Sequence, residues 1–296
     1  MEFFAAFKAA GGELDQYLIA GPDISRVVER YTELTGRMAM PPRWSLGYHQ
    51  CRHSYYPEAE VLEIADELRT RGFPADGLWL DIDYMDEFRV WTWSPTDFPD
   101  PEAMIQTLRD QGFRTVVIID PAVKEEPSWP VYASGLDDDL YLTEADGSPY
   151  VGVVWPEEAV YPDFTNPATR AWWAGLVPTM TDVGVDGLWT DMNEPADFAT
   201  DTHTVPDHVL AHGEGHPTTM MEAHNVYGST MAQATRQGLV DARPDERPFV
   251  LTRAGYAGVQ REAAVWTGDA PSTWDALQQT VPTATMPKPL FPSHRP

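Results

Sequence analysis

Short apolar runs recur along the chain, and longer amphipathic stretches separate them. A strand with one wet face alternates apolar and polar residues, whereas a strand buried on both faces is apolar throughout. Most of these runs are uniformly apolar until their last residues, which is typical of parallel strands inside a sheet. They predict six strands, at residues 44–50, 77–83, 115–120, 187–192, 248–254 and 263–269.

Segments with the spacing of amphipathic helices lie between these runs, at residues 57–72, 100–112, 166–184 and 222–238. Proline stands near the start of the first three, and glycine ends all four, as in many natural helices. A proline inside a helix costs about 3 kcal/mol, so Pro178 predicts a kink or a restart in the third helix. The repeated strand–helix alternation predicts an α/β fold with a parallel sheet.

Two architectures contain such a sheet: a doubly wound nucleotide-binding fold and a (β/α)8 TIM-type barrel. The first requires a Gly-rich turn after a strand, and the sequence contains neither a GxGxxG nor a Walker motif. The predicted strands end in aspartates, and a barrel gathers its active-site residues at the carboxyl ends of its strands. The sequence therefore favours the barrel, with five strand-end candidates: Asp81, Asp83, Asp120, Asp191 and Asp269.

The predicted barrel is incomplete, because a closed one has eight strands. We expect it to occupy residues 41–281, after a remnant of an N-terminal β-sandwich and its linker at residues 1–40, where residues 13–21 predict a strand. Five prolines among the last fifteen residues cannot continue a barrel. They predict an unstructured tail over residues 282–296.

Two long segments, residues 121–163 and 193–221, are predicted to be functional loops, as loops of this length usually are. The second contains histidines whose spacing raises the question of a metal site: His203, His208, His212 and His216. Glycines and prolines among them argue against the helix that would align these side chains. We expect a polar lid, no metal and no cofactor.

The net charge of −26, from 20 Lys+Arg and 46 Asp+Glu, repels phosphate backbones and argues against nucleic-acid binding. The single cysteine, Cys51, has no partner for an internal disulfide. No signal peptide is apparent, and no apolar run approaches the length of a membrane span. These features predict a cytoplasmic protein with no membrane partner. The many aromatic residues near the acidic strand ends suit stacking on sugars.

The stretch GLWTDMNEPADF at residues 187–198 is open to two interpretations. Asp, Asn and Pro can begin a helix, or a rigid strand can hold a carboxylate at an active-site rim. Glycoside hydrolysis requires two carboxyl groups that flank the scissile bond. Each strand-end aspartate taken alone is more simply a helix cap or a salt-bridge partner, so residue types alone do not select the pair.

The sequence resembles glycoside hydrolase family 31, the α-glucosidase and α-xylosidase group, over roughly residues 13–280. The resemblance rests on motifs in the family's order: MPPRWSLGYHQCRHSYY, LWLDIDYMD, FPDP, IIDPAV, YPDFTNP, DGLWTDMNEP, LTRAGYAGVQR and VWTGDAPSTW. It implies that Asp191 is the catalytic nucleophile and Asp269 the acid/base. It also implies that Asp81 and Arg253 face the sugar in the −1 subsite. Further lining residues are implied at Ile82, Trp155, Trp189, Met192 and Trp266.

Asn193 and Glu194 are predicted to support Asp191, and the −1 subsite histidine usual in the family has no counterpart in the chain. The main hypothesis is a retaining, exo-acting α-glycoside hydrolase, most simply an α-glucosidase, acting on an α-linked oligosaccharide or α-glucoside. The alternative is a truncated, inactive fragment that at most binds carbohydrate. A third hypothesis, a metal-dependent hydrolase, would use the histidines of residues 203–216.

Overall fold

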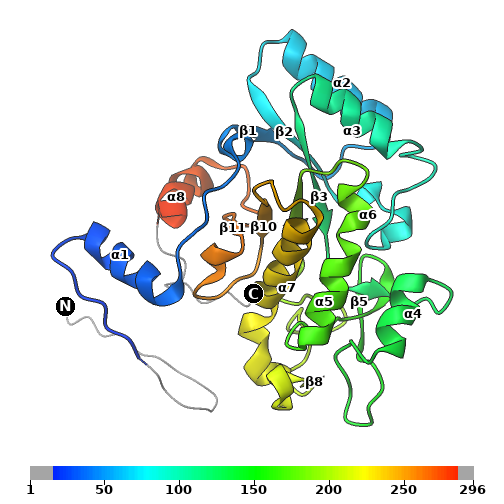
Figure 1. Ribbon diagram of the computed structural model, residues 1–296, viewed down its shortest axis with the longest axis vertical. Coiled ribbons are helices and arrows are strands. Elements are labelled where there is room, and N and C mark those ends of the chain that lie inside the picture. Colours follow the sequence, from blue (N-terminus) through cyan, green and yellow to red (C-terminus); the bar gives the residue numbers. More distant parts are fainter. Residues whose placement is uncertain (1–15, 286–296) are drawn as a thin grey trace.

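A computed structural model describes the backbone of residues 16–285 and the side chains of residues 16–280. Its central feature is a curled sheet of six parallel strands in the order β1-β2-β3-β7-β10-β11 (Figure 1). The strands are β1 (Tyr48–Gln50), β2 (Ala75–Leu80), β3 (Arg114–Ile119), β7 (Gly187–Thr190), β10 (Val250–Thr252) and β11 (Ala264–Val265). All six predicted strands are confirmed, and the predicted incomplete barrel corresponds to this sheet.

The predicted ranges extend beyond the ends of the observed strands. The first was expected from residue 44, but Arg43–Leu46 form the 3-10 turn η1, in which the Ser45 N–H bonds the Pro42 carbonyl. In the second, Ile82–Tyr84 form another 3-10 turn, η2, which Asp81 caps. Backbone groups satisfied inside a turn cannot join the sheet ladder, so pairing stops at these residues.

Helices cover the outer face of the sheet (Figure 1). They are α2 (Glu58–Thr70), α3 (Pro101–Asp110), α5 (Pro167–Leu176), α6 (Pro178–Thr181) and α7 (Met220–Ala242). Helix α3 packs on β3, α7 packs on β7 and β10, and α5 packs along α7. The four predicted helices are confirmed, and so is the predicted restart at Pro178. None of the helices in the described part of the chain is long and apolar enough to cross a membrane.

The segment at residues 121–163, predicted to be a loop, is an ordered insertion. It contains β4 (Val123–Lys124), α4 (Pro130–Asp137), β5 (Val151–Val154) and β6 (Glu157–Val160), and the strands form an antiparallel sheet in the order β4-β6-β5. The prediction was wrong because strands of two to four residues offer too few positions to establish a period. The segment at residues 193–221 is mostly irregular, with a short hairpin of β8 (Leu210–Ala211) and β9 (Thr218–Thr219).

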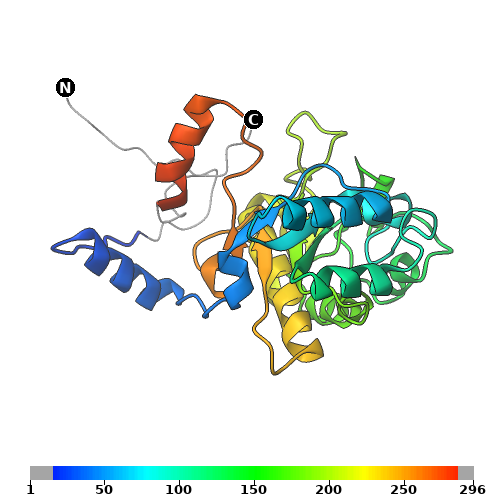
Figure 2. The ribbon, with the colours of Figure 1, turned by 90° about the horizontal axis from the view of Figure 1, so that it is seen from above.

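Two further helices, α1 (Ile24–Thr35) and α8 (Trp274–Thr285), lie outside the layered body (Figures 1 and 2). Residues 16–21 of the predicted N-terminal strand have no regular structure, and residues 13–15 lie outside the described part. A helix satisfies its own backbone groups, whereas a lone strand leaves its ladder unpaired. Helix α8 includes residues 282–285 of the predicted tail, and residues 286–296 lie outside the described part.

Candidate active site

The carboxyl ends of four neighbouring strands place a row of polar and aromatic residues at one level. The last paired residues of β3, β7, β10 and β11 are in register across the sheet: Ile119, Thr190, Thr252 and Val265. The residues that follow them form the row: Asp120, Asp191, Arg253 and Trp266. Backbone bonds extend the ladder to it, because the Arg253 N–H donates to the Thr190 carbonyl at 3.0 Å and the Asp191 N–H to the Ile119 carbonyl at 3.4 Å.

Three tryptophan rings lie together on the face of the sheet that bears this row. Trp189 lies two residues before Asp191, so both side chains project from the same face of the strand. Its ring centroid is 5.8 Å from that of Trp79 and 5.5 Å from that of Trp266. Trp189 is buried, and its indole Nε1 has no hydrogen-bond partner. The predicted lining residues Trp189 and Trp266 therefore lie together, next to the acidic row.

The guanidinium of Arg253 joins the predicted catalytic pair. It holds Glu194 by two hydrogen bonds, with N–O distances of 2.6 and 2.8 Å. Its Nη1 lies 3.0 Å from Asp191 Oδ1 and 3.9 Å from Asp269 Oδ2. These two oxygens are therefore at most 6.9 Å apart, which is the sum of the two distances. The structure thus brings two carboxylates separated by 78 positions in the sequence to one cation.

Asp191 is buried, and burial raises the pKa of its carboxyl to about 6. The Arg253 charge and the Met192 backbone N–H lower this pKa, while the charges of Glu194 and Asp269 raise it. The contact with Arg253 is an ion pair without the geometry of a hydrogen bond, so the buried Oδ1 accepts no hydrogen bond. Asp191 is therefore mostly ionised at neutral pH, with an oxygen available for attack.

Asp269 differs from Asp191 in its surroundings. It follows β11 in the irregular segment at residues 266–273, and 83% of its side chain is exposed. The preceding Gly268 has a φ of 84°, a conformation that favours glycine. A solvent-facing carboxyl on this segment can both give and accept a proton at the mouth of the site.

The loop after Asp191 is tied to β10 by the two predicted supporting residues. Asn193 is fully buried; its Oδ1 accepts from the Ala254 N–H, and its Nδ2 donates to Thr252 Oγ1, both at 2.9 Å. Glu194 holds Arg253. Buried Met192 has a left-handed φ of 53°, which turns the chain away from the strand. No helix begins within residues 191–198, so the helix-start interpretation of this stretch is wrong.

Asp81 and its neighbours line the adjacent strand end. Asp81 follows β2 and is 9% exposed, and its Oδ1 accepts the Ile82 N–H at 2.8 Å. Burial raises its pKa, whereas the Ile82 N–H and the charge of His53 lower it. Ile82 is itself buried. Asp83 is half-buried within η2 and makes no contact that assigns it a role.

Trp155 lies at the turn between β5 and β6 of the inserted sheet and not on the six-stranded sheet. It is 41% exposed, and its ring packs edge-on against Phe198 with centroids 5.3 Å apart. The ring of His53 approaches it to 6.2 Å. The predicted lining residue Trp155 is thus part of an aromatic rim.

Two residues at or near the site had no predicted role. Asp120 was recognised only as one strand-end carboxylate. Asp197 is fully buried and accepts hydrogen bonds from the Tyr150 hydroxyl at 2.5 Å and the Val153 N–H at 3.0 Å, which ties the inserted sheet to the loop after Asp191. Its partners lie 47 and 44 positions away, so no local sequence signal marks this bond.

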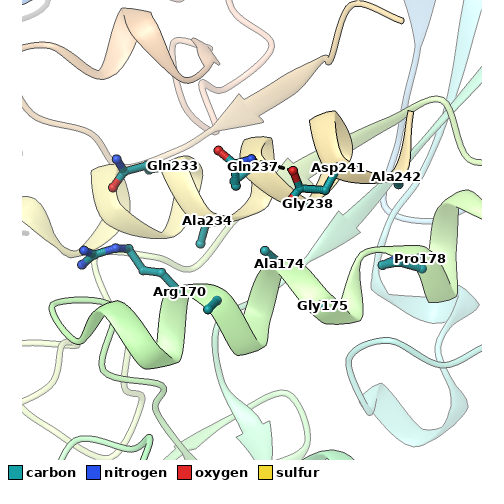
Figure 3. A pocket seen from close by; sticks show the side chains of 11 residues that line it. Arg170, Ala174, Gly175, Pro178, Gln233, Ala234, Gln237, Gly238, Asp241 and Ala242 are labelled. Carbon is teal, nitrogen blue, oxygen red and sulfur yellow. Dashed lines mark hydrogen bonds between the residues drawn. The ribbon is translucent and has the colours of Figure 1, made fainter. Parts of the chain in front are cut away.

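Two of the histidines of residues 203–216 have side-chain partners of their own. His208 lies 3.5 Å from Glu144, and Nδ1 of His212 accepts the Gly215 N–H at 2.9 Å. Within residues 16–280, no group of three or more His, Cys, Asp or Glu side chains has a metal-binding arrangement. A groove of about 520 Å³ lies between α5 and α7 (Figure 3), lined in part by Arg170, Gln233 and Asp241. None of the strand-end carboxylates lines this groove.

Residues 38–287 match the model of the glycosyl hydrolases family 31 TIM-barrel domain. The chain belongs to glycosyl hydrolase family 31. It is 46% identical over 276 residues to alpha-glucosidase 2 of Bacillus thermoamyloliquefaciens, covering 93% of this chain and 35% of that protein. It is 38% identical over 281 residues to an alpha-glucosidase of Saccharolobus solfataricus, covering 88% of this chain and 40% of that protein.

Solved structures of glucosidases share the fold described above. The crystal structure of the glucosidase II alpha subunit in its DNJ-bound form superposes with a TM-score of 0.82 at 39% identity, covering 87% of this chain and 28% of that one. A family 31 alpha-glucosidase from Bacteroides thetaiotaomicron gives a TM-score of 0.76 at 45% identity, covering 86% and 41%. This chain therefore spans 28–41% of the length of these four relatives.

Proposed function

We propose that this family 31 protein acts as a retaining, exo-acting α-glucosidase on α-linked gluco-oligosaccharides and α-glucosides. The observation that carries the proposal is the position of Arg253 Nη1, 3.0 Å from Asp191 and 3.9 Å from Asp269. One carboxylate is buried and the other exposed, which suits a nucleophile and a proton-transfer group. The alpha-glucosidase names of the relatives support the substrate class.

In the proposed reaction, Asp191 attacks the anomeric carbon while Asp269 gives a proton to the leaving oxygen. The glycosidic bond breaks and a glycosyl ester forms on Asp191. Asp269 then takes a proton from water, which attacks the same carbon and releases the ester, so that the sugar leaves with its original configuration. Arg253 limits repulsion between the two carboxylates while both are charged. The tryptophan floor formed by Trp79, Trp189 and Trp266 gives the site an apolar wall on which a sugar face can pack. The exo mode is taken from the family resemblance.

The proposal is tested by trapping the ester with 5-fluoro-α-glucosyl fluoride and mapping the labelled peptide by mass spectrometry. The expected label is on Asp191, it is absent in Asp191→Asn, and proton NMR shows the α-anomer of glucose as the first product. In Asp269→Ala, we expect azide to restore turnover of an activated aryl α-glucoside. A label on another residue, or the β-anomer as first product, would falsify the assignment.

The second candidate is a protein that binds the terminal sugar without hydrolysing it. The 83% exposure of the Asp269 side chain favours it, because burial is the usual means of keeping a carboxyl protonated for acid catalysis. In that case an iminosugar raises the melting temperature of the chain, whereas aryl α-glucoside is not turned over. Turnover that disappears in Asp191→Asn excludes this candidate.

A further inference from the structure

Asp120 lies beside the proposed nucleophile on the neighbouring strand. The register of β3 and β7 ends at the pair Ile119 and Thr190, and the Asp191 N–H reaches back to the Ile119 carbonyl. Adjacent strands are about 4.8 Å apart, and residues at one level project from the same face. The two carboxyl side chains therefore leave the sheet next to each other, on the side that the tryptophan floor occupies.

Both carboxyl groups are buried, and each has an oxygen that lacks a hydrogen-bond donor. Asp120 is 6% exposed and Asp191 is 8% exposed. In each, Oδ1 is buried and accepts no hydrogen bond. A buried carboxylate without a donor is costly, and two neighbouring carboxylates in a poorly solvated site do not both ionise. A proton on one of the two groups removes both costs, because it cancels a charge and supplies the missing donor.

The charges around Asp120 show which group keeps that proton. Asp81 acts on it from the end of β2, Asp191 and Glu194 from the segment after β7, and Arg253 from the end of β10. Of these, Arg253 is the one positive group, and its guanidinium is already engaged with Glu194 and Asp191. The hydroxyl of the remaining neighbour, buried Tyr84 in η2, donates to the Ile118 carbonyl at 2.8 Å.

Burial, together with the charges of Asp191, Asp81 and Glu194, raises the pKa of Asp120 well above the usual carboxyl range. The pKa of Asp191 is raised only to about 6, because Arg253 contacts it directly. When the Asp120–Asp191 pair loses its first proton, Asp191 is therefore the group that becomes negatively charged.

We propose that Asp120 is a positioning residue that stays in its acid form and directs its proton to the Asp191 carboxylate. The inference rests on the proposed role of Asp191 as nucleophile. The O–H of Asp120 holds Asp191 in the orientation for attack and keeps the nucleophile ionised without adding a second negative charge. The effect of Asp120 on the reaction is therefore exerted through Asp191.

The first test compares the pH dependence of kcat/KM for an aryl α-glucoside in Asp120→Asn and Asp120→Ala. The Asn amide replaces the donor, so we expect an unchanged acid limb and kcat within about threefold of the wild type. Ala removes the donor, so Asp191 is harder to ionise; its acid limb moves to higher pH and kcat falls at least about tenfold. If Asp120 were ionised, both substitutions would remove a negative charge and move the acid limb to lower pH, which would overturn the proposal.

The second test needs no turnover. Infrared spectra of the 296-residue chain with ¹³C-labelled aspartate are recorded at pH 7, with circular dichroism to verify the fold of each variant. We expect a band from a protonated carboxyl that Asp120→Asn lacks and that Asp269→Asn, which leaves both buried carboxyl groups in place, retains. Absence of the band in the wild type, or its persistence in Asp120→Asn, refutes the assignment of the proton.

The two tests separate the present inference from the proposed function. If the Asp120 band is present but 5-fluoro-α-glucosyl fluoride labels no residue, the assigned protonation state is supported and the proposed function is refuted. If the fluoroglucoside labels Asp191 but the Asp120 band is absent, the proposed function is supported and the role of Asp120 is refuted.

Discussion

Asp191, the proposed nucleophile, lies in surroundings that are expected to lower the stability of the fold. Asp191 keeps a carboxylate at 8% exposure next to Glu194 and Asp269, with Arg253 as its counter-ion. Burying an ion without full compensation costs free energy of unfolding. The same negative charge is what a carboxylate needs in order to act as a nucleophile. Stability and chemistry are therefore opposed at this residue.

Replacing Asp191 with Asn is expected to stabilise the protein at neutral pH. The pKa of Asp191 is about 6 in the folded chain and about 3.9 in an unfolded one. The folded state thus binds the proton more tightly, and stability falls as pH rises between these two values. Asp191→Asn should gain about 3 kcal/mol in the free energy of unfolding at pH 7 and nothing below pH ~3.5, measured by urea denaturation.

The matched control is Asp269→Asn, because that side chain is 83% exposed and carries little burial cost. Its free energy of unfolding should stay within about 0.5 kcal/mol of the wild type at both pH values. A loss of stability in Asp191→Asn at pH 7 would contradict the electrostatic account, and so would an equal gain at both pH values.

Replacing Glu194 with Gln is expected to change the pH profile of the proposed hydrolysis. Glu194 raises the pKa of Asp191 and holds Arg253 by two short hydrogen bonds. Without this charge, the acid limb of kcat/KM for an aryl α-glucoside should move to lower pH. The loosened guanidinium should reduce kcat/KM about tenfold. Glu246→Gln serves as control, because its contact with Arg243 is 3.9 Å long and exposed. An acid limb that moves to higher pH in Glu194→Gln contradicts this role.

Residue patterns predicted the acidic strand ends but not the contacts between them. Asp81, Asp120 and Asp191 each end an apolar run, and that local signal needs no knowledge of the fold. The Arg253–Glu194 pair spans 59 positions, and its partners become neighbours only after β7 and β10 pair. The roles of Arg253 and Asp269 came from the family resemblance, because neither burial nor pairing can be deduced from residue types.

At the level of elements, two glycines test how closely α5 and α7 pack. A Cβ on Gly238 of α7 would lie 2.4 Å from Val177 Cγ2 and 2.7 Å from the Ala174 carbonyl oxygen. A Cβ on Gly175 of α5 meets no atom within 4 Å. Both glycines line the groove between the helices (Figure 3). The two positions share a helical backbone and differ in the space beside them.

Gly238→Ala is expected to destabilise the protein by about 1–2 kcal/mol, because overpacking outweighs the better helix propensity of alanine. Gly175→Ala should gain up to about 1 kcal/mol from propensity alone. Urea denaturation of both variants measures the difference. Equal changes in the free energy of unfolding of the two variants would show that the α5–α7 contact can accommodate a methyl group at position 238.

Prediction from pattern worked best for elements with both faces buried. In β3, the four residues Val116–Ile119 are all at most 1% exposed, and the apolar run located this strand to within one residue. The inserted sheet was missed because its strands are short and β5 alternates between exposed and buried positions over four residues. Helix α1 was missed although its sequence carries a helix signal. The Asp23 side chain caps its N-terminus by accepting the Arg26 N–H.

At the scale of the whole molecule, the net charge of −26 sets the response to salt. Self-repulsion of uncompensated charge destabilises a compact state, and salt reduces the Debye length from about 30 Å at 0.01 M to about 3 Å at 1 M. Salt also weakens exposed ion pairs such as Arg71–Glu67, but such pairs are worth at most about 1 kcal/mol each. The loss of repulsion among the excess carboxylates should therefore affect stability more than the weakening of exposed ion pairs does.

We expect added NaCl to raise the melting temperature at pH 7 by about 2–4 °C. A shift of this size corresponds to about 1 kcal/mol in the free energy of unfolding. The control is the same titration near pH 4.4, the isoelectric point calculated from the sequence, where the net repulsion disappears and the rise should disappear with it. Sucrose, an uncharged solute that acts through exclusion from the surface, should stabilise at both pH values. A melting temperature that falls with salt at pH 7 would show that local ion pairs outweigh the net charge. An equal rise at both pH values would assign the effect to the salt's action on hydrophobic burial.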